Sequence, residues 1–126
     1  MKFLSILFVA VLVLSGCGGA VRQNGEYRKI SPDQAQQMMQ DDVIILDVRT
    51  PEEFDGGHIE NAILLPDYEV KDNVQNISPD KTKTILIYCR TGRRSEIAAK
   101  QLINMGYTNA IDFGGIVDWT GQIVQD

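Results

Sequence analysis

The chain has 126 residues, 44% of them hydrophobic, which is enough for one domain with its own core. It carries 12 Lys and Arg residues against 17 Asp and Glu residues, for a formal net charge of −5. This acidic balance leaves no basic face beyond one short loop, so nucleic acid is not expected as a partner.

Residues 1–16 are predicted to be a targeting segment. Lys2 is followed by an apolar run over residues 3–14, which fits the central part of a signal peptide and is too short to span a membrane. The next residues, Leu14-Ser15-Gly16-Cys17, resemble the lipobox of bacterial lipoproteins. That resemblance implies a lipid on Cys17 and a domain outside the cytoplasm, anchored to a bacterial membrane in the cell envelope. An uncleaved anchor and an ordinary secreted protein are the alternatives.

Residues 17–27 are expected to form a flexible tether, and residues 28–126 the domain. The sequence Ser31-Pro32-Asp33-Gln34 predicts a helix start, because it combines a capping serine, a proline at the first helical position and a glutamine that completes a capping box. The β-branched run at 43–46 predicts a parallel strand covered on both faces.

The rest of the chain alternates between apolar runs and helical patterns. Further short strands are expected at 62–65, 84–88 and 109–113, and helices after Pro51, over 68–77, and from Ser95 to a terminating glycine at Gly106. Strands that alternate with helices at this spacing predict an α/β domain with a mostly parallel sheet. In such sheets ligands bind at the carboxyl ends of the strands.

The most informative segment is Cys-Arg-Thr-Gly-Arg-Arg-Ser at residues 89–95, directly after the apolar strand. A strand, a short loop and a helix N-terminus bring backbone N–H groups toward one point, which favours an anion. The same dipoles and the nearby guanidinium groups are expected to stabilise a thiolate on Cys89. A merely buried cysteine is the alternative, but a structural loop does not need three arginines within five positions. The loop therefore predicts a sulfur nucleophile beside a site for an anionic substrate.

From about Arg28 to Asp126 the chain resembles the single-domain rhodaneses, the thiosulfate sulfurtransferase family. The matching features are Asp47-Val48-Arg49, Glu53-Phe54 followed by Gly57-His58-Ile59, the loop at 89–95, and Gly114-Gly115 followed by Trp119. One departure is Glu60-Asn61-Ala62, where family members often have a Pro-Gly-Ala-like stretch. The resemblance implies a five-stranded, mostly parallel sheet flanked by helices.

The resemblance also implies the chemistry. Cys89 attacks the outer sulfur of thiosulfate, releases sulfite and becomes a persulfide, which passes its sulfur to cyanide or to a thiol acceptor. The implied substrate-binding residues are Arg90, Thr91, Gly92, Arg93, Arg94 and Ser95. Backbone N–H groups would hold the anion, Gly92 would allow a positive φ, and one of the arginines would receive the dianion. For Ser95, a plain helix-capping role is the alternative.

The other matched residues have structural interpretations beside functional ones. Asp47 and Arg49 are expected to pair with each other or to brace the loop, with direct substrate contact as the less favoured alternative. His58 is expected to be a hydrogen-bonded structural residue, and Trp119 a core or lid residue. No cofactor is expected, and no cluster of metal ligands is present in the sequence.

Two rival functions remain open. Tyrosine phosphatases, dual-specificity phosphatases and some arsenate reductases have an arginine six residues after the cysteine, where this chain has Ser95, with Arg94 one position early. The shorter loop favours a sulfur atom over a phosphoryl group. Alternatively, a membrane-tethered persulfide carrier or sulfur-relay module would keep Cys89 and turn over small molecules poorly. Kinetics must separate carrier from enzyme.

Overall fold

The structure is a computed structural model that describes residues 25–125. The expected targeting segment, the expected lipid site at Cys17 and most of the expected tether lie outside these residues, so those expectations stay predictions. Within the described part of the chain, no helix has the length and apolar character needed to cross a membrane.

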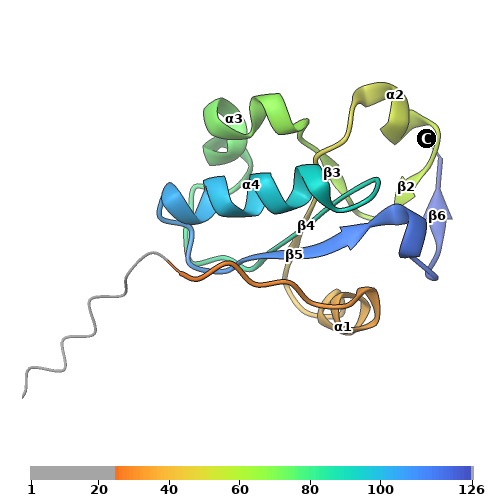
Figure 1. The fold of residues 1–126 in the computed structure, drawn as a ribbon, viewed down its shortest axis with the longest axis horizontal. Coiled ribbons are helices and arrows are strands. Elements are labelled where there is room, and N and C mark those ends of the chain that lie inside the picture. The colour runs from red at the N-terminus through yellow and green to blue at the C-terminus, as the bar shows by residue number, and fades with distance from the viewer. Residues whose placement is uncertain (1–24, 126) are drawn as a thin grey trace, which may run out of the picture.

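The domain alternates strands and helices, as expected (Figure 1). In chain order the elements are α1 (Pro32–Met38), β1 (Ile44–Asp47), α2 (Pro51–Asp55), β2 (His58–Ile59), β3 (Ile63–Leu64), the 3₁₀ helix η1 (Asp67–Glu69), α3 (Val70–Ile77), β4 (Ile85–Cys89), α4 (Arg93–Asn104), β5 (Ala110–Gly115), the 3₁₀ helix η2 (Ile116–Asp118) and β6 (Ile123–Val124). Four strands form one parallel sheet in the order β3-β1-β4-β5. The predicted α/β fold is confirmed.

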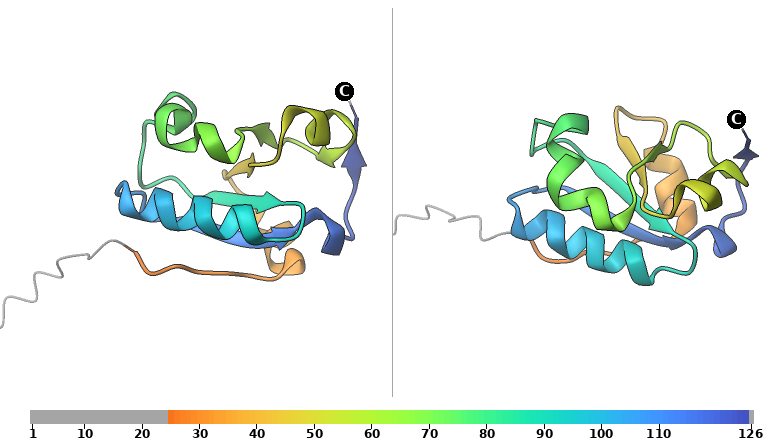
Figure 2. Two further views of the ribbon diagram at one scale, coloured as in Figure 1. Left: turned by 45° about the horizontal axis from the view of Figure 1, so that its top comes forward. Right: turned by 90° about the horizontal axis from the view of Figure 1, so that it is seen from above.

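Helices cover both faces of this sheet (Figure 2). Along β4, Ile85, Ile87 and Cys89 belong to an apolar cluster with α3 and α4, whereas Leu86 and Tyr88 belong to a second cluster with α1. All five residues of β4 are buried, because both faces are covered. This arrangement explains why the strand reads as a continuous apolar run.

The expected fifth strand needs a correction, because the sheet has four strands and only a single bridge in place of a fifth. Lys29 pairs in parallel with Asp112 on the outer edge of β5. The Ile30 N–H donates to the Asp112 carbonyl at 2.9 Å, and the Asp112 N–H donates to the Arg28 carbonyl at 3.1 Å. Pairing stops there because Ser31 begins the cap of α1, so the chain turns away from the sheet.

The boundary expected between tether and domain also moves. Tyr27 was expected to end the tether, but it packs against the α4-side apolar cluster. Its hydroxyl donates to Asp112 Oδ2 at 2.5 Å, and Lys100 Nζ lies 5.1 Å from its ring centroid. Asp112 is fully buried, so this bond satisfies a carboxylate in the interior. The folded domain therefore includes Tyr27.

Two segments of only two residues form a pair that the sequence patterns did not predict. β2 and β6 are antiparallel, with His58 opposite Val124 and Ile59 opposite Ile123. Strands this short have no readable periodicity. The pair closes the end of the domain where the C-terminus lies (Figure 1).

Candidate active site

Cys89 lies where the sequence places it, at the carboxyl end of β4 and on the α4 side of the sheet. Its side chain is buried, with 1% of the residue exposed. The N–H of Gly92 donates to Cys89 Sγ at 3.0 Å. Gly92 has a φ of 106°, a conformation that favours glycine, and this turn brings the N–H back to the sulfur.

The first turn of α4 supplies further donors. The helix begins at Arg93, with Gly92 as its N-cap, and its first backbone bond runs from the Glu96 N–H to the Gly92 carbonyl at 3.2 Å. The N–H groups of Arg93, Arg94 and Ser95 precede that bond, so they have no helical acceptor. The positive end of this 12-residue helix thus lies beside Cys89, whose sulfur accepts from the Gly92 N–H.

Ser95 does not cap α4, which corrects one of the two roles expected for it. Gly92 is the N-cap and no side chain caps this helix. Ser95 is instead fully buried, and Cys89 Sγ lies 3.4 Å from its Oγ. The Ser95 hydroxyl is also within bonding distance of the Gly92 carbonyl at 3.1 Å and the Gly114 carbonyl at 3.3 Å. It therefore joins the sulfur, the loop and β5.

The three arginines of the loop differ in their exposure and in their ion pairing. Arg94 forms a two-pronged ion pair with Glu53 of α2, with Nη1 to Oε1 at 2.7 Å and Nη2 to Oε2 at 2.9 Å. Arg90 and Arg93 are exposed. Of the arginines expected to receive a dianion, Arg94 is thus the one whose charge a carboxylate already balances.

Glu53 is a site residue whose role the sequence did not indicate, although it belongs to the matched Glu53-Phe54 pair. Its carboxylate also accepts hydrogen bonds from the backbone and hydroxyl of Thr50, at 3.3 and 3.2 Å, in a capping box at the start of α2. The hydrogen bond from Arg94 is the largest influence on this carboxyl group and, with the Thr50 bonds, lowers its pKa to about 2. Glu53 thus joins α2 to the active-site loop as a stable anion.

Gly115 permits the close contact between β5 and the loop. A Cβ atom at this position would lie 2.6 Å from the Cα atom of Thr91, closer than atoms of this kind approach. The Val117 N–H donates to the Arg90 carbonyl at 3.3 Å and adds a second backbone contact to the loop. Both residues of the Gly114-Gly115 pair belong to β5, and Gly115 is the one that allows the backbone contact with the loop.

Asp47 and Arg49 pair with each other, which was one of the expected alternatives. Both are buried, and Arg49 Nη2 donates to Asp47 Oδ2 at 2.7 Å and to the Gly57 carbonyl at 2.7 Å. His58 is also buried, and it stacks on Phe54 with ring centroids 3.7 Å apart. These contacts give the three polar residues structural roles in the connection between β1 and β2.

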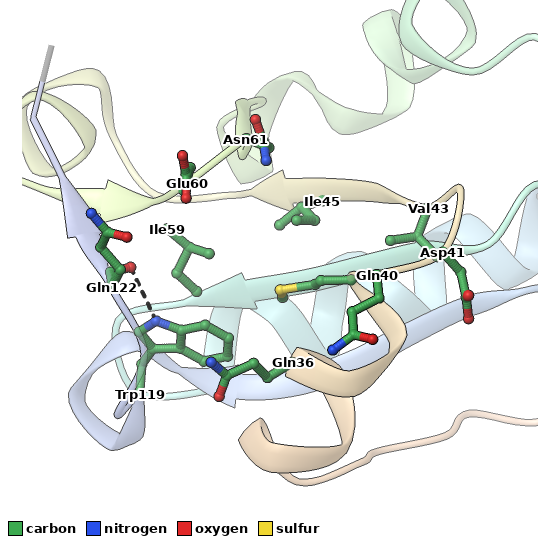
Figure 3. Close-up of a pocket in the computed structure, with 11 residues that line it drawn as sticks. Gln36, Gln40, Asp41, Val43, Ile45, Ile59, Glu60, Asn61, Trp119 and Gln122 are labelled. Carbon is green, nitrogen blue, oxygen red and sulfur yellow. Dashed lines mark hydrogen bonds between the residues drawn. The ribbon is translucent and has the colours of Figure 1, made fainter.

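A cavity of about 500 Å³ lies on the other face of the sheet, away from Cys89 (Figure 3). Its floor includes Ile45 and Ile59 of the α1-side cluster, and its rim carries the carboxylates of Asp41 and Glu60. Trp119 lines this cavity and donates from Nε1 to the Gln122 carbonyl at 3.3 Å, so its indole is not placed over the thiol. The acidic rim makes the cavity unsuited to an anionic substrate.

The arrangement around Cys89 combines a nucleophile with donors for an anion. Among residues 25–125 no group of three His, Cys, Asp or Glu side chains is placed to hold a metal ion. The residues present can perform thiol chemistry on an anion that is held by backbone N–H groups.

Comparisons with known proteins agree with this chemistry. Residues 31–122 match the rhodanese-like domain family. Thiosulfate sulfurtransferase PspE of Escherichia coli is 41% identical over 73 residues, which are 58% of this chain and 70% of that protein. Thiosulfate sulfurtransferase GlpE of Pseudomonas syringae is 28% identical over 102 residues, which are 80% of this chain and 94% of that protein.

Solved structures give the same result. A rhodanese with anions from E. coli is 37% identical and superposes with a TM-score of 0.62, covering 66% of this chain and 98% of that chain. A rhodanese-related protein from Thermoplasma volcanium is 28% identical, with a TM-score of 0.71, and covers 79% of this chain and 100% of that chain. The likeness therefore extends over most of the described domain.

Proposed function

Because the chain belongs to the rhodanese-like family, we propose that it is a thiosulfate sulfurtransferase that carries sulfur as a persulfide on Cys89. Its relatives support sulfur transfer in general. The observation that carries the proposal is the contact between the Gly92 N–H and Cys89 Sγ at 3.0 Å, at the N-terminus of α4. A sulfur anion at this point has donors already directed at it.

In the first half-reaction, the Cys89 thiolate attacks the outer sulfur of thiosulfate. A new S–S bond forms, the bond between the two thiosulfate sulfurs breaks, and sulfite leaves with the electron pair. In the second half-reaction, cyanide or an acceptor thiolate attacks the terminal sulfur of the persulfide. Thiocyanate or an acceptor persulfide forms, and the Cys89 thiolate returns, so the cycle needs no general base once the thiolate is present.

The loop supports both steps. The N–H groups at the start of α4 would first hold the thiosulfate oxygens and later the terminal persulfide sulfur, which carries the negative charge. Arg90 and Arg93 are exposed and can attract the dianion. The Ser95 hydroxyl, 3.4 Å from Sγ, can turn from a carbonyl toward the thiolate. Each of these groups favours negative charge at Cys89.

For the location, we propose a lipid-anchored protein of a bacterial cell envelope. The support is the sequence Leu-Ser-Gly-Cys at residues 14–17, after an apolar run of signal-peptide length. In this arrangement Cys17 carries the lipid and Cys89 is the thiol available for chemistry. The acceptor in that compartment would be a thiol or cyanide.

The test is the intact mass of the full chain in detergent before and after thiosulfate is added. We expect a gain of one sulfur atom, its loss when cyanide is added, and the appearance of thiocyanate. Cys89→Ser is the matched control and should gain nothing. A sulfur adduct without multiple turnovers would indicate the persulfide carrier instead. No adduct at all would contradict the proposal, and turnover of phosphate esters or arsenate would then identify the oxyanion rival.

A further inference from the structure

The segment that enters the domain runs beside β5, from the N-terminal end of the described chain toward α1 (Figure 1). Its single bridge places Lys29 opposite Asp112, three residues before the end of β5. Lys29 is exposed, and it belongs to none of the motifs that the sequence pointed out. Its backbone is fixed by the two hydrogen bonds of the bridge, so the position of its side chain relative to the sheet is defined.

Alternation along this extended segment separates its side chains between the two faces of the sheet. Tyr27 points to the α4 face, where it contacts Asp112 and Lys100. Arg28 donates instead to Asn109 Oδ1 at 3.2 Å. Lys29 therefore returns to the face on which Cys89 lies.

The Lys29 side chain reaches the active-site loop. A Cβ atom on Gly92 would lie 3.9 Å from Lys29 Nζ, and one on Gly114 would lie 3.7 Å from Lys29 Cε. The ammonium group thus lies beside Gly92, whose N–H is bonded to Cys89 Sγ. Ordinary bond lengths then limit the distance between Lys29 Nζ and Sγ to about 10 Å, which is about one Debye length in 0.1 M salt.

We propose that Lys29 is a specificity-determining residue that favours anionic sulfur donors of higher charge. The proposal rests on the sulfurtransferase function proposed above. Arg94 is the other cation whose position near the sulfur is fixed, and its charge is balanced by the Glu53 carboxylate at 2.7 Å. The carboxylate opposite Lys29 belongs to Asp112. It is buried and accepts its hydrogen bonds from Tyr27 and Gly114. Lys29 acts through its charge, on capture of the anion rather than on breaking its S–S bond.

The experiment compares two donors of different charge in the full chain. Thiosulfate is a dianion, and methanethiosulfonate is a monoanion with the same kind of transferable sulfur. In Lys29→Gln, we expect kcat/KM to fall about fivefold for thiosulfate and about twofold for methanethiosulfonate at low salt, because the Coulomb energy is proportional to the donor's charge. Both losses should shrink in 0.5 M salt. Lys29→Arg should keep the wild-type ratio.

Arg28→Gln is the matched control, because it removes one positive charge from the neighbouring residue on the other face of the sheet. A donor ratio in Lys29→Gln equal to that of wild type, or an equal change in Arg28→Gln, would overturn the proposal. An equal loss for both donors that persists in high salt would also overturn it, because it would show a structural effect rather than a charge effect.

A second readout does not depend on sulfur transfer. Alkylation of Cys89 by the anion iodoacetate, divided by its alkylation by neutral iodoacetamide, reports the local potential at the thiolate. This ratio should fall about twofold to threefold in Lys29→Gln and stay unchanged in Arg28→Gln. If thiosulfate leaves no sulfur on the wild-type chain, the proposed function fails while this ratio still decides the role of Lys29.

Discussion

Arg94 and Glu53, 41 residues apart in the sequence, share two hydrogen bonds of 2.7 and 2.9 Å between α4 and α2. Both side chains are less than one-third exposed, so solvent screens this pair less than an ordinary surface ion pair. Glu53 also belongs to the capping box at the start of α2. The pair therefore fixes the first turn of α4, which follows the Cys89 loop, to α2. The active-site loop is thus held by two different contacts: the ion pair with Glu53 of α2 and the backbone contact with Gly115 of β5.

Glu53→Gln should destabilise the protein by about 1 kcal/mol at pH 7, since the amide keeps the capping box but removes the negative charge that pairs with Arg94. The pKa of Glu53 is lowered from 4.5 to about 2 in the folded state. Its stabilising effect is therefore complete above pH 4.5 and is lost as the pH falls toward 2.

Urea unfolding of both proteins between pH 7 and pH 3 should show this difference in the free energy of unfolding shrinking with acid. Glu52→Gln is the control, because Glu52 is exposed in the same turn of α2. A difference that does not change with pH would mean that the ion pair does not stabilise the fold.

Gly115→Ala should displace the active-site loop. The added methyl group would lie 2.6 Å from Thr91 Cα, and the neighbouring atoms belong to the backbone, which cannot rotate away. We expect a loss of roughly 1–3 kcal/mol in stability and at least a tenfold loss of sulfur transfer. Gly56→Ala is the matched control. Its methyl group would lie 3.5 Å from the nearest atom, the Glu53 carbonyl oxygen, and its φ of −72° suits alanine. Full activity in Gly115→Ala would show that the loop tolerates a shift.

Tyr27→Phe should destabilise the domain, although Tyr27 is the last residue of the segment expected to be a tether. The change leaves the fully buried carboxylate of Asp112 without its 2.5 Å partner, at a cost of about 1–3 kcal/mol. Thermal unfolding measures the effect. Tyr68→Phe, at a residue 66% exposed, should leave the melting temperature unchanged. Equal melting temperatures for wild type and Tyr27→Phe would place the domain boundary after residue 27.

Cys17→Ser should release the protein from membranes without altering its specific activity. The proposed lipid on Cys17 is the source of membrane binding, whereas Cys89 lies in the folded domain. Fractionation of cells into membrane and soluble parts measures the first effect, and thiocyanate formation measures the second. A variant that stays with the membrane would contradict the lipoprotein assignment.

The features that the sequence predicted depend on neighbouring residues. The capping box from Ser31 to Gln34 and the glycine after α4, with a φ of 97° at Gly106, are local patterns and appear in the structure as expected. The β4 strand and the loop after it were also predictable, because the run of apolar residues and the cluster of arginines are adjacent.

The features that it missed depend on contacts between distant residues. Nothing near Glu53 indicates that its partner is Arg94, and nothing near Lys29 indicates that Gly92 lies beside it. Ser95 was assigned a possible capping role because serine favours that position, but the turn at Gly92 starts the helix two residues earlier. The first two contacts depend on how α2 packs beside α4 and how the entering segment pairs with β5, and the third depends on the turn at Gly92, whose φ is 106°.

The parallel bridge at Lys29 also sets the direction in which the domain faces. Gly25 lies near Thr108, before β5 begins, whereas Cys89 lies where the parallel strands end. The chain therefore enters the domain at one end of the sheet, and the Cys89 thiol lies at the other end. A strand of six residues is about 20 Å long, which sets the separation between the two. The point at which the described chain begins, Gly25, thus lies about a strand's length from the sulfur. A domain held at a surface by that end would direct its reactive sulfur outward, toward partners that diffuse freely.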